Sequence, residues 1–387
     1  MRVLSVTLVA PALAWLALAE LTLAHPAAGQ ERGRARPAPS AAADTRPTFT
    51  VGSATAARGQ TAYGAISVPA GSDSGMTMPV AVIHGARPGP VIAFVAGSHG
   101  TEYASVVALT RLIGQLDAKT LAGTVIVAPL LNVPSFDQMI VHVNPVDRKG
   151  MNAQYPGDAA GTQTQRALAL VTRQVVEPAD VVVDLHGGDL DEDLRPYSYW
   201  IRTGNTRQDS ASRALAMAFG LDHIIIRDIN VATPASTRSL SGYALSKGKT
   251  TFVAEAGRSG TVDPRDVDAL VDGALNVLGA LKVLEMMGHA GRGVAHPVWL
   301  SGAGARVAAD SAGMFFAAVG RGTYVARGSR VGYTTDYLGR ATGDVLAPVA
   351  GVVTFIRGVP SMWKGATLVN IAPVFAEPPP YATPAAP

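Results

Sequence analysis

Four side chains that could bind a metal or move a proton stand where short apolar runs of the sequence end: His99, Glu102, His186 and Glu255. Each lies within three residues of a glycine, where the backbone can approach a ligand closely. Two histidines and a glutamate are a known ligand set for catalytic zinc, with a fourth position left for water. A nearby carboxylate can accept a proton as that water attacks a carbonyl. We therefore predict a zinc hydrolase with His99, Glu102 and His186 as metal ligands and Glu255 as the catalytic base.

Taken one at a time, these residues carry little information. A His-x-x-Glu pair alone is weak evidence for a metal site. His186 alone is also explained as a hydrogen-bonded histidine at a strand end, and Glu255 alone as an ion-pair partner of Arg258. Asp184 either supports His186 through a hydrogen bond or satisfies a backbone group. The combination is stronger than its parts, because ligands of open α/β sheets bind beyond the carboxyl ends of the strands.

The elements that must position these side chains are apolar runs alternating with helical patterns. The runs are apolar on both faces, which is typical of strands covered by helices on both sides. They comprise residues 91–96, 125–128, 181–183, 223–226 and 251–254, and helices are expected over 164–176 and 267–287. The pattern predicts an α/β domain over residues 48–290, with a mostly parallel or mixed sheet flanked by helices.

The pattern changes after residue 290. Short strand-like runs are separated by glycines and no stretch has helical periodicity, so residues 291–375 are predicted to form a small all-β domain. Residues 376–387, rich in proline and alanine, are expected to be a disordered tail. Residues 30–47, rich in alanine, proline and arginine, are expected to be a flexible leader.

The N-terminus indicates export. A short positive start, an apolar stretch and small residues predict a secretory signal peptide over residues 1–29, cleaved after Gly29. We expect the mature protein to be periplasmic or secreted, with no membrane association after cleavage. An uncleaved signal anchor is the alternative, because the apolar run is about the length of a short membrane span, ~17 residues.

Composition excludes several classes of protein. The chain of 387 residues is 48% hydrophobic and 16% charged, which favours a globular fold. The net charge is only +3 and no basic cluster with interleaved aromatics is found, so nucleic acid is not an expected partner. There is no cysteine, which excludes disulfides, thiolate metal sites and a cysteine nucleophile.

The remaining histidines are weaker candidates. His142 is intermediate, because it precedes a long polar loop at residues 144–157 and such loops are usually functional or mobile. The others are interpreted as structural or solvated: His25, His84, His223, His289 and His296.

Several motifs, in the right order, resemble those of the succinylglutamate desuccinylase/aspartoacylase family, which belongs to the zinc carboxypeptidase-like superfamily. The resemblance runs from about residue 52 to residue 372 and covers most of the chain. The motifs are the turn 85–90, the segment 97–102 (GSHGTE), the loop 144–157, the segment 184–187 (DLHG), the turn 255–257 (EAG), and the glycine-rich segments 312–315 and 347–351 of the β region.

The resemblance implies an N-deacylase or related amidohydrolase with one Zn²⁺ per chain, the ligands and base being those named above. It also implies that Asn152 helps to hold a substrate carboxylate. Ala153 stands where the family usually has an arginine, and residues 136–143 contain none of the upstream arginines often found there. Either Arg148 or Arg166 substitutes from another position, or the substrate lacks that carboxylate, or both are ordinary surface arginines.

Three functions stay open at this point. The first is an exported zinc amidohydrolase that acts on an N-acylated amino acid, a peptide or a cell-wall fragment. The second is a carboxypeptidase-like peptide hydrolase, and the missing arginines count against it. The third is a non-catalytic metal- or ligand-binding protein of the same fold. The expected partner is a small-molecule or peptide substrate, and the oligomeric state is open.

Overall fold

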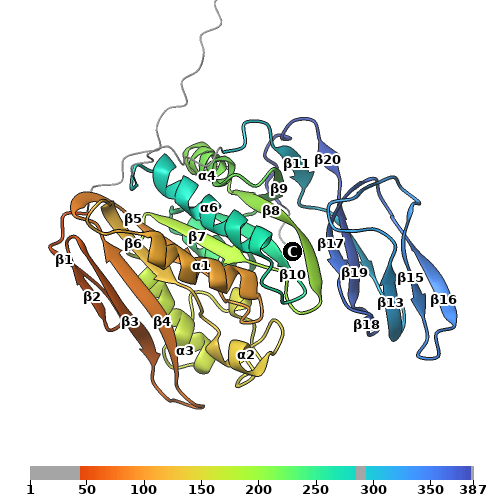
Figure 1. Cartoon of the computed structure of the whole chain (residues 1–387), viewed down its shortest axis with the longest axis horizontal. Helices are drawn as coiled ribbons and strands as arrows, with labels where there is room; N and C mark the ends of the chain where they lie inside the picture. The colour runs from red at the N-terminus through yellow and green to blue at the C-terminus, as the bar shows by residue number, and fades with distance from the viewer. Residues whose placement is uncertain (1–43, 285–292, 385–387) are drawn as a thin grey trace, which may run out of the picture. The chain divides into compact units, whose positions relative to one another are not determined.

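The computed structural model describes residues 44–284 and 293–384 (Figure 1). The predicted signal peptide, most of the leader, His25, His289 and the boundary at residue 290 lie outside the described residues. None of the described helices is long and apolar enough to cross a membrane.

The centre of the fold is a mixed sheet of 14 strands. Its middle strands run in the order β8, β10, β7, β5, β6, β4, β3; β10, β7, β5 and β6 are parallel, and β8, β4 and β3 pair antiparallel. The predicted mixed α/β sheet is confirmed. The bounds are β3 (Gln60–Val68), β4 (Met76–His84), β5 (Arg87–Val95), β6 (Ala122–Ala128), β7 (Val181–His186), β8 (Glu192–Arg202), β9 (His223–Asp228) and β10 (Thr250–Arg258), with a separate hairpin β1 (Thr48–Val51) and β2 (Ala54–Ala57).

Helices cover both faces of this sheet, as the apolar runs require. On β5, Ile92 and Phe94 belong to one buried core, and Ala93 and Val95 belong to another, because successive strand residues point to opposite faces. The first core includes residues of α1, α4 and α6, and Figure 1 shows α1 and α6 side by side. The second includes residues of α3 and α5. The helix bounds are α1 (Tyr103–Gln115), α2 (Val133–Gln138), α3 (Gln163–Val171), α4 (Thr206–Phe219), α5 (Leu240–Ser246) and α6 (Pro264–Ala280).

The two helices expected from the sequence are present, with shifted ends. The segment expected at 164–176 forms α3 and continues as a π-helical turn at Thr172–Val176. The helix expected at 267–287 is α6, which begins earlier because Asp263 caps it by accepting a hydrogen bond from the backbone N–H of Arg265. Leu270 and Val277 of α6 are buried in the first core, and each such side chain contributes about 1.5–3 kcal/mol.

The C-terminal region is all-β, and part of it extends the central sheet. β11 lies parallel to β9, and β17 pairs with the start of β8. A further four-stranded sheet has the order β16, β15, β13, β18. The bounds are β11 (Val298–Ser301), β12 (Ala305–Ala308), β13 (Gly313–Ala317), β14 (Tyr324–Val325), β15 (Arg330–Thr335), β16 (Ala341–Leu346), β17 (Gly351–Arg357), β18 (Ser361–Met362), β19 (Thr367–Ala372) and β20 (Val374–Phe375).

Beyond β20, the described part of the predicted tail has no regular structure but contacts the body of the protein. Arg202 donates to the carbonyl of Pro379 at 2.6 Å, and the Tyr381 hydroxyl donates to the carbonyl of Ile229 at 3.1 Å. These contacts place residues 379–381 against the ends of β8 and β9.

Candidate functional site

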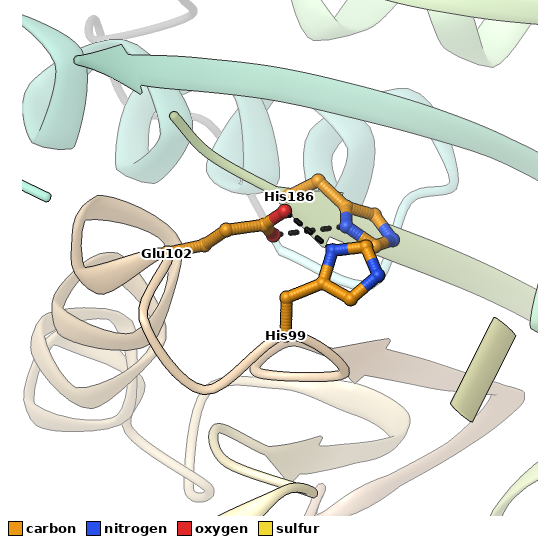
Figure 2. A group of neighbouring side chains, drawn as sticks. All are labelled: His99, Glu102 and His186. Carbon is orange, nitrogen blue, oxygen red and sulfur yellow. Dashed lines mark hydrogen bonds and ion pairs between the residues drawn. The ribbon is translucent and has the colours of Figure 1, made fainter. Parts of the chain in front are cut away.

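The three predicted metal ligands lie together at one edge of the sheet (Figure 2). Nδ1 of His99 is 2.6 Å from Oε1 of Glu102, and Nδ1 of His186 is 2.9 Å from Oε2 of the same carboxylate. One ligand atom from each residue lies within 4.8 Å of the others. The two imidazoles therefore face the carboxylate from different directions, and the three groups surround a common point.

Local sequence explains why His99 and Glu102 point to this place. β5 ends at Val95, and a tight turn leads into α1, whose N-terminal flanking residue is Glu102. Gly97 has φ +67°, and a Cβ there would lie 2.8 Å from Cα of Leu130. A Cβ on Gly100 would lie 2.3 Å from the backbone nitrogen of Phe136. Glycine at both positions lets the turn pack against the neighbouring loop and fixes the two ligands.

The protonation of Glu102 and that of the two histidines depend strongly on one another. Burial would raise the pKa of Glu102, but the facing His186 and His99 outweigh it and hold that pKa well below its usual range. Burial would likewise lower the pKa of His186, yet Glu102 and Asp184 raise it well above its ordinary value. Positive charge nearby therefore stabilises the ionised, buried carboxylate of Glu102. A divalent cation can supply this charge, and two imidazole nitrogens with one carboxylate are a donor set that suits zinc.

His186 is held on its other side as well. Its Nε2 is 3.2 Å from Oδ1 of Asp184 and 3.2 Å from Nδ2 of Asn152. Asp184 therefore lies directly beside the histidine ring, and its role stays a prediction. The Oδ1 atom of Asn152 is buried and has no hydrogen-bond partner among the described residues. It is available to a group bound in the cavity.

Glu255 lies beside His186 on the adjacent parallel strand, because β10 and β7 pair these two residues directly. The hydroxyl of Tyr197 donates to Oε2 of Glu255 at 2.7 Å. Burial raises the pKa of Glu255, although His186 and the Tyr197 hydrogen bond oppose that rise. The partner of this carboxylate is therefore a buried tyrosine and not Arg258.

A cavity of about 380 Å³ opens onto these groups. It reaches residues that sequence reasoning did not select on β8, β9 and the loop after β9, as well as Phe355 of β17 and Asn370 of β19. The lining residues are His99, Glu102, His142, Asn152, Asp184, His186, Glu192, Leu194, Tyr197, Tyr199, Ile201, Arg227, Ala235, Ser236, Ser239, Ser241, Val253, Glu255, Phe355 and Asn370. On β8 the lining residues alternate from Tyr197 to Ile201, but a shift in the pairing with β10 between Leu194 and Tyr197 interrupts the two-residue period, so the sequence pattern alone did not reveal this wall.

The two arginines considered as replacements do not reach this cavity. Arg148 is exposed and is absent from the lining, and Ala153 is exposed too. Arg166 is buried in an ion pair with Asp73 at 2.7 Å. Neither arginine is placed to hold a ligand beside Asn152.

His142 belongs to a second group at the cavity wall. Its Nδ1 is 3.2 Å from Oδ2 of Asp189, and its Nε2 is 3.9 Å from Oε1 of Glu192. Its ring meets that of His99 edge-on, with 5.4 Å between centroids. This histidine has a φ of +61°, a backbone conformation uncommon for a residue with a side chain.

Comparison with known proteins gives consistent results. Residues 88–281 match the family described as the succinylglutamate desuccinylase/aspartoacylase catalytic domain. A curated relative, the N-alpha-acetyl-L-2,4-diaminobutyric acid deacetylase of Halomonas elongata, is 28% identical over 221 residues, which are 56% of this chain and 63% of that protein. The chain thus spans less than two thirds of that relative.

Solved structures share the fold. A succinylglutamate desuccinylase/aspartoacylase from Rhodobacter sphaeroides has a TM-score of 0.71 at 23% identity, over 82% of this chain and 96% of that one. The product-bound ectoine utilization protein EutE (DoeB) of Ruegeria pomeroyi has a TM-score of 0.73 at 22% identity, over 85% and 100%. With the family match over half of the chain, we conclude that this protein belongs to the succinylglutamate desuccinylase/aspartoacylase family.

Proposed function

We propose that this protein is a zinc-dependent amidohydrolase that removes an acyl group from an amine. The observation that carries the proposal is the placement of Glu255 on the strand next to His186, in the same cavity as the His99, Glu102 and His186 cluster. A ligand set and a buried carboxylate base at one site are what hydrolysis of an amide requires.

His99, Glu102 and His186 would hold one zinc ion. When bound, zinc supplies Lewis acidity and lowers the pKa of a bound water towards ~7. Asp184, in contact with Nε2 of His186, fixes the orientation of that imidazole. Glu102 is held in turn by the backbone N–H of Gly187 at 3.1 Å. The ligands are thus oriented before any substrate arrives.

Glu255 accepts the proton of the attacking water and then donates it to the leaving amine. The hydroxyl of Tyr197 occupies Oε2, so the other carboxylate oxygen is left to exchange the proton. Burial raises the pKa of Glu255, which makes this carboxylate a stronger base for taking the proton from the attacking water. Asn152 lies beside His186 with a free carbonyl oxygen and would contact the substrate near the scissile amide.

The substrate is an N-acylated amino acid or short peptide. A cavity of about 380 Å³ suits a small molecule. The predicted signal peptide at residues 1–29 supports export, so we propose that the reaction takes place outside the cytoplasm. The relatives named as deacetylase and desuccinylase agree with removal of a small acyl group.

The test is release of free amine from a panel of N-acetyl and N-succinyl amino acids by the zinc-loaded protein, compared with the Glu255→Gln variant. We expect the variant to keep its zinc and lose at least ~100-fold in rate, the lower range for acid–base catalysis. If Glu255→Gln keeps its activity, Glu255 is not the base. If the wild type hydrolyses none of the N-acyl amino acids in the panel, the proposed reaction is wrong.

A further inference from the structure

Three adjacent strands present alternate side chains to the cavity. Glu255 of β10 pairs with Tyr197 of β8, and four residues further along β8, Ile201 pairs with Arg227 of β9. Tyr197, Ile201, Arg227 and Glu255 all line the cavity. Because every second residue of a strand points to the same face, Arg227 projects from the same side of the sheet as the proposed base.

Arg227 is the only lysine or arginine among the described residues that line this cavity. It is exposed, and its guanidinium has no hydrogen bond or ion pair with another described residue. Its neighbour Asp228 is already held by Arg202 at 2.8 Å and so does not neutralise it. A cavity therefore contains one unpaired guanidinium, whose planar fork suits a carboxylate.

The position of Arg227 keeps it away from the reacting atoms. With strands ~4.8 Å apart and a rise of ~3.3 Å per residue, two strand spacings and four residues separate the Cα atoms of Glu255 and Arg227 by about 16 Å. The strand position of Arg227 is therefore well separated from that of the proposed base. This spacing favours contact between Arg227 and a part of the substrate remote from the scissile amide.

The wall around Arg227 is polar and joins the loop that carries Asn152. Ser236 and Ser239, in the segment after β9, line the cavity. In that segment, the carbonyl of Arg238 accepts a hydrogen bond of 3.0 Å from the backbone N–H of Tyr155. One continuous wall thus runs from the asparagine beside the ligands to the strand of Arg227, with hydroxyl groups along it.

The two ends of the cavity differ in the charged groups that line them. The ligand end carries four carboxyl groups, those of Glu102, Asp184, Glu192 and Glu255. These carboxyl groups offer a second negative charge on a substrate no positive partner, whereas Arg227 attracts it. The charge pattern thus favours a single orientation of an anionic substrate.

We propose that Arg227 binds a carboxylate of the substrate remote from the scissile amide, so that this protein selects N-acylated acids over their neutral amides. This specificity deepens the proposed function and rests on it for the reaction, but the binding step is measurable without turnover. Arg227 acts as a specificity residue and not as a catalytic one.

The binding test uses the zinc-loaded protein with Glu255→Gln, so that turnover does not interfere. Calorimetry would measure N-acetylated amino acids and dipeptides, each as the free acid and as the C-terminal amide. We expect at least one acid to bind roughly 10- to 100-fold more tightly than its amide, as for hydrogen bonds to a charged group. Adding Arg227→Gln should abolish the difference, and Arg227→Lys should restore part of it. Arg207→Gln, at an exposed arginine of α4 outside the cavity, is the matched control and should change nothing.

Equal binding of every acid and its amide, or a preference that persists in Arg227→Gln, would overturn the proposal. Measuring hydrolysis as well as binding distinguishes a failure of the Arg227 proposal from a failure of the proposed reaction. If no substrate is hydrolysed but the Arg227-dependent preference is present, the carboxylate site stands and the proposed reaction fails. If substrates are hydrolysed with the same acid-to-amide ratio of kcat/KM in Arg227→Gln, the reaction stands and the role of Arg227 fails.

Discussion

Two clusters of histidine and carboxylate side chains meet at the wall of one cavity, and they are built from different parts of the fold. The first consists of His99, Glu102 and His186, which come from the tight turn between β5 and α1 and from the end of β7. The second consists of His142, Asp189 and Glu192. His142 lies in a loop, and its side chain is 51% exposed against 7% for His186.

The difference lies in how firmly each group is held. In the first cluster both oxygens of Glu102 face an imidazole, and His186 contacts Asp184 behind it. In the second, His142 has one close carboxylate, Asp189, and a more distant one at 3.9 Å. Rigid elements hold ligands to the tolerance that a metal needs, whereas a loop does so less well. This difference supports the first cluster as the proposed metal site, although His142 belongs to two further groups that could hold a metal ion, one with His99 and Asp189 and one with Asp191 and Glu192.

The largest expected effect separates the two clusters by metal content. His186→Ala removes a ligand and should reduce bound zinc from about one per chain to almost none, since three protein ligands suit a single catalytic zinc. His142→Ala is the matched variant and should keep the metal. Zinc content by elemental analysis decides between them. Loss of zinc in His142→Ala with retention in His186→Ala would reverse the assignment.

A smaller effect is expected at Tyr197, which supports the first cluster through Glu255. Tyr197→Phe removes a hydrogen bond worth about 1 kcal/mol and should slow turnover roughly 5-fold. Burial raises the pKa of Glu255 and the Tyr197 hydrogen bond lowers it. Without that bond the pKa rises further, so more of the base is protonated and the acid limb of the kcat/KM profile moves to higher pH.

The metal content and thermal stability of Tyr197→Phe serve as its controls, because the aromatic ring and its packing are kept. An unchanged acid limb, with the rate reduced at all pH values alike, would show that the hydroxyl does not act through Glu255.

The smallest effect concerns Glu192 in the second cluster. Burial and the neighbouring Glu102, Asp189 and Glu255 raise the pKa of Glu192 well above its ordinary value. The folded metal-free protein therefore holds this proton where the unfolded chain, with a pKa near ~4.3, has lost it. Stability falls as pH rises from the unfolded value towards the folded one.

Glu192→Gln mimics the protonated form and should remove this loss. We expect the metal-free variant to unfold about 2 °C higher than the wild type near pH 7, with no difference below about pH 4. Thermal unfolding followed at both pH values provides the measurement. A variant that is less stable at neutral pH would mean that the ionised carboxylate is stabilised by His142.

The sequence was sufficient to predict the core of the fold and the convergence of His99, Glu102, His186 and Glu255. Strands β5, β7 and β10 are neighbours and parallel, so residues that follow their apolar runs meet at one edge. Histidine and glutamate are also residue types that can bind zinc or transfer a proton, which singled out these four residues as candidates. The roles of these residues, the signal peptide and the domain limits at 48–290 and 291–375 stay predictions.

Tyr197 and Arg227 could not be found in the same way, because their place depends on strand register. Nothing in the residues of β8 shows that Tyr197 pairs with Glu255, or that Arg227 follows on the next strand. Phe355 enters the cavity wall because β17 pairs with Leu194 of β8, a contact between segments far apart in the chain. Such long-range pairing leaves no local pattern in the sequence.

We propose that the first cluster binds the zinc ion needed for amide hydrolysis. The decisive experiment measures zinc per chain in the purified protein together with the release of amine from an N-acyl amino acid, before and after chelation. We expect about one zinc per chain, activity that disappears on chelation, and activity that returns when zinc is added back. No bound zinc when the ion is offered, or hydrolysis that survives removal of the ion, would rule out the proposed zinc site.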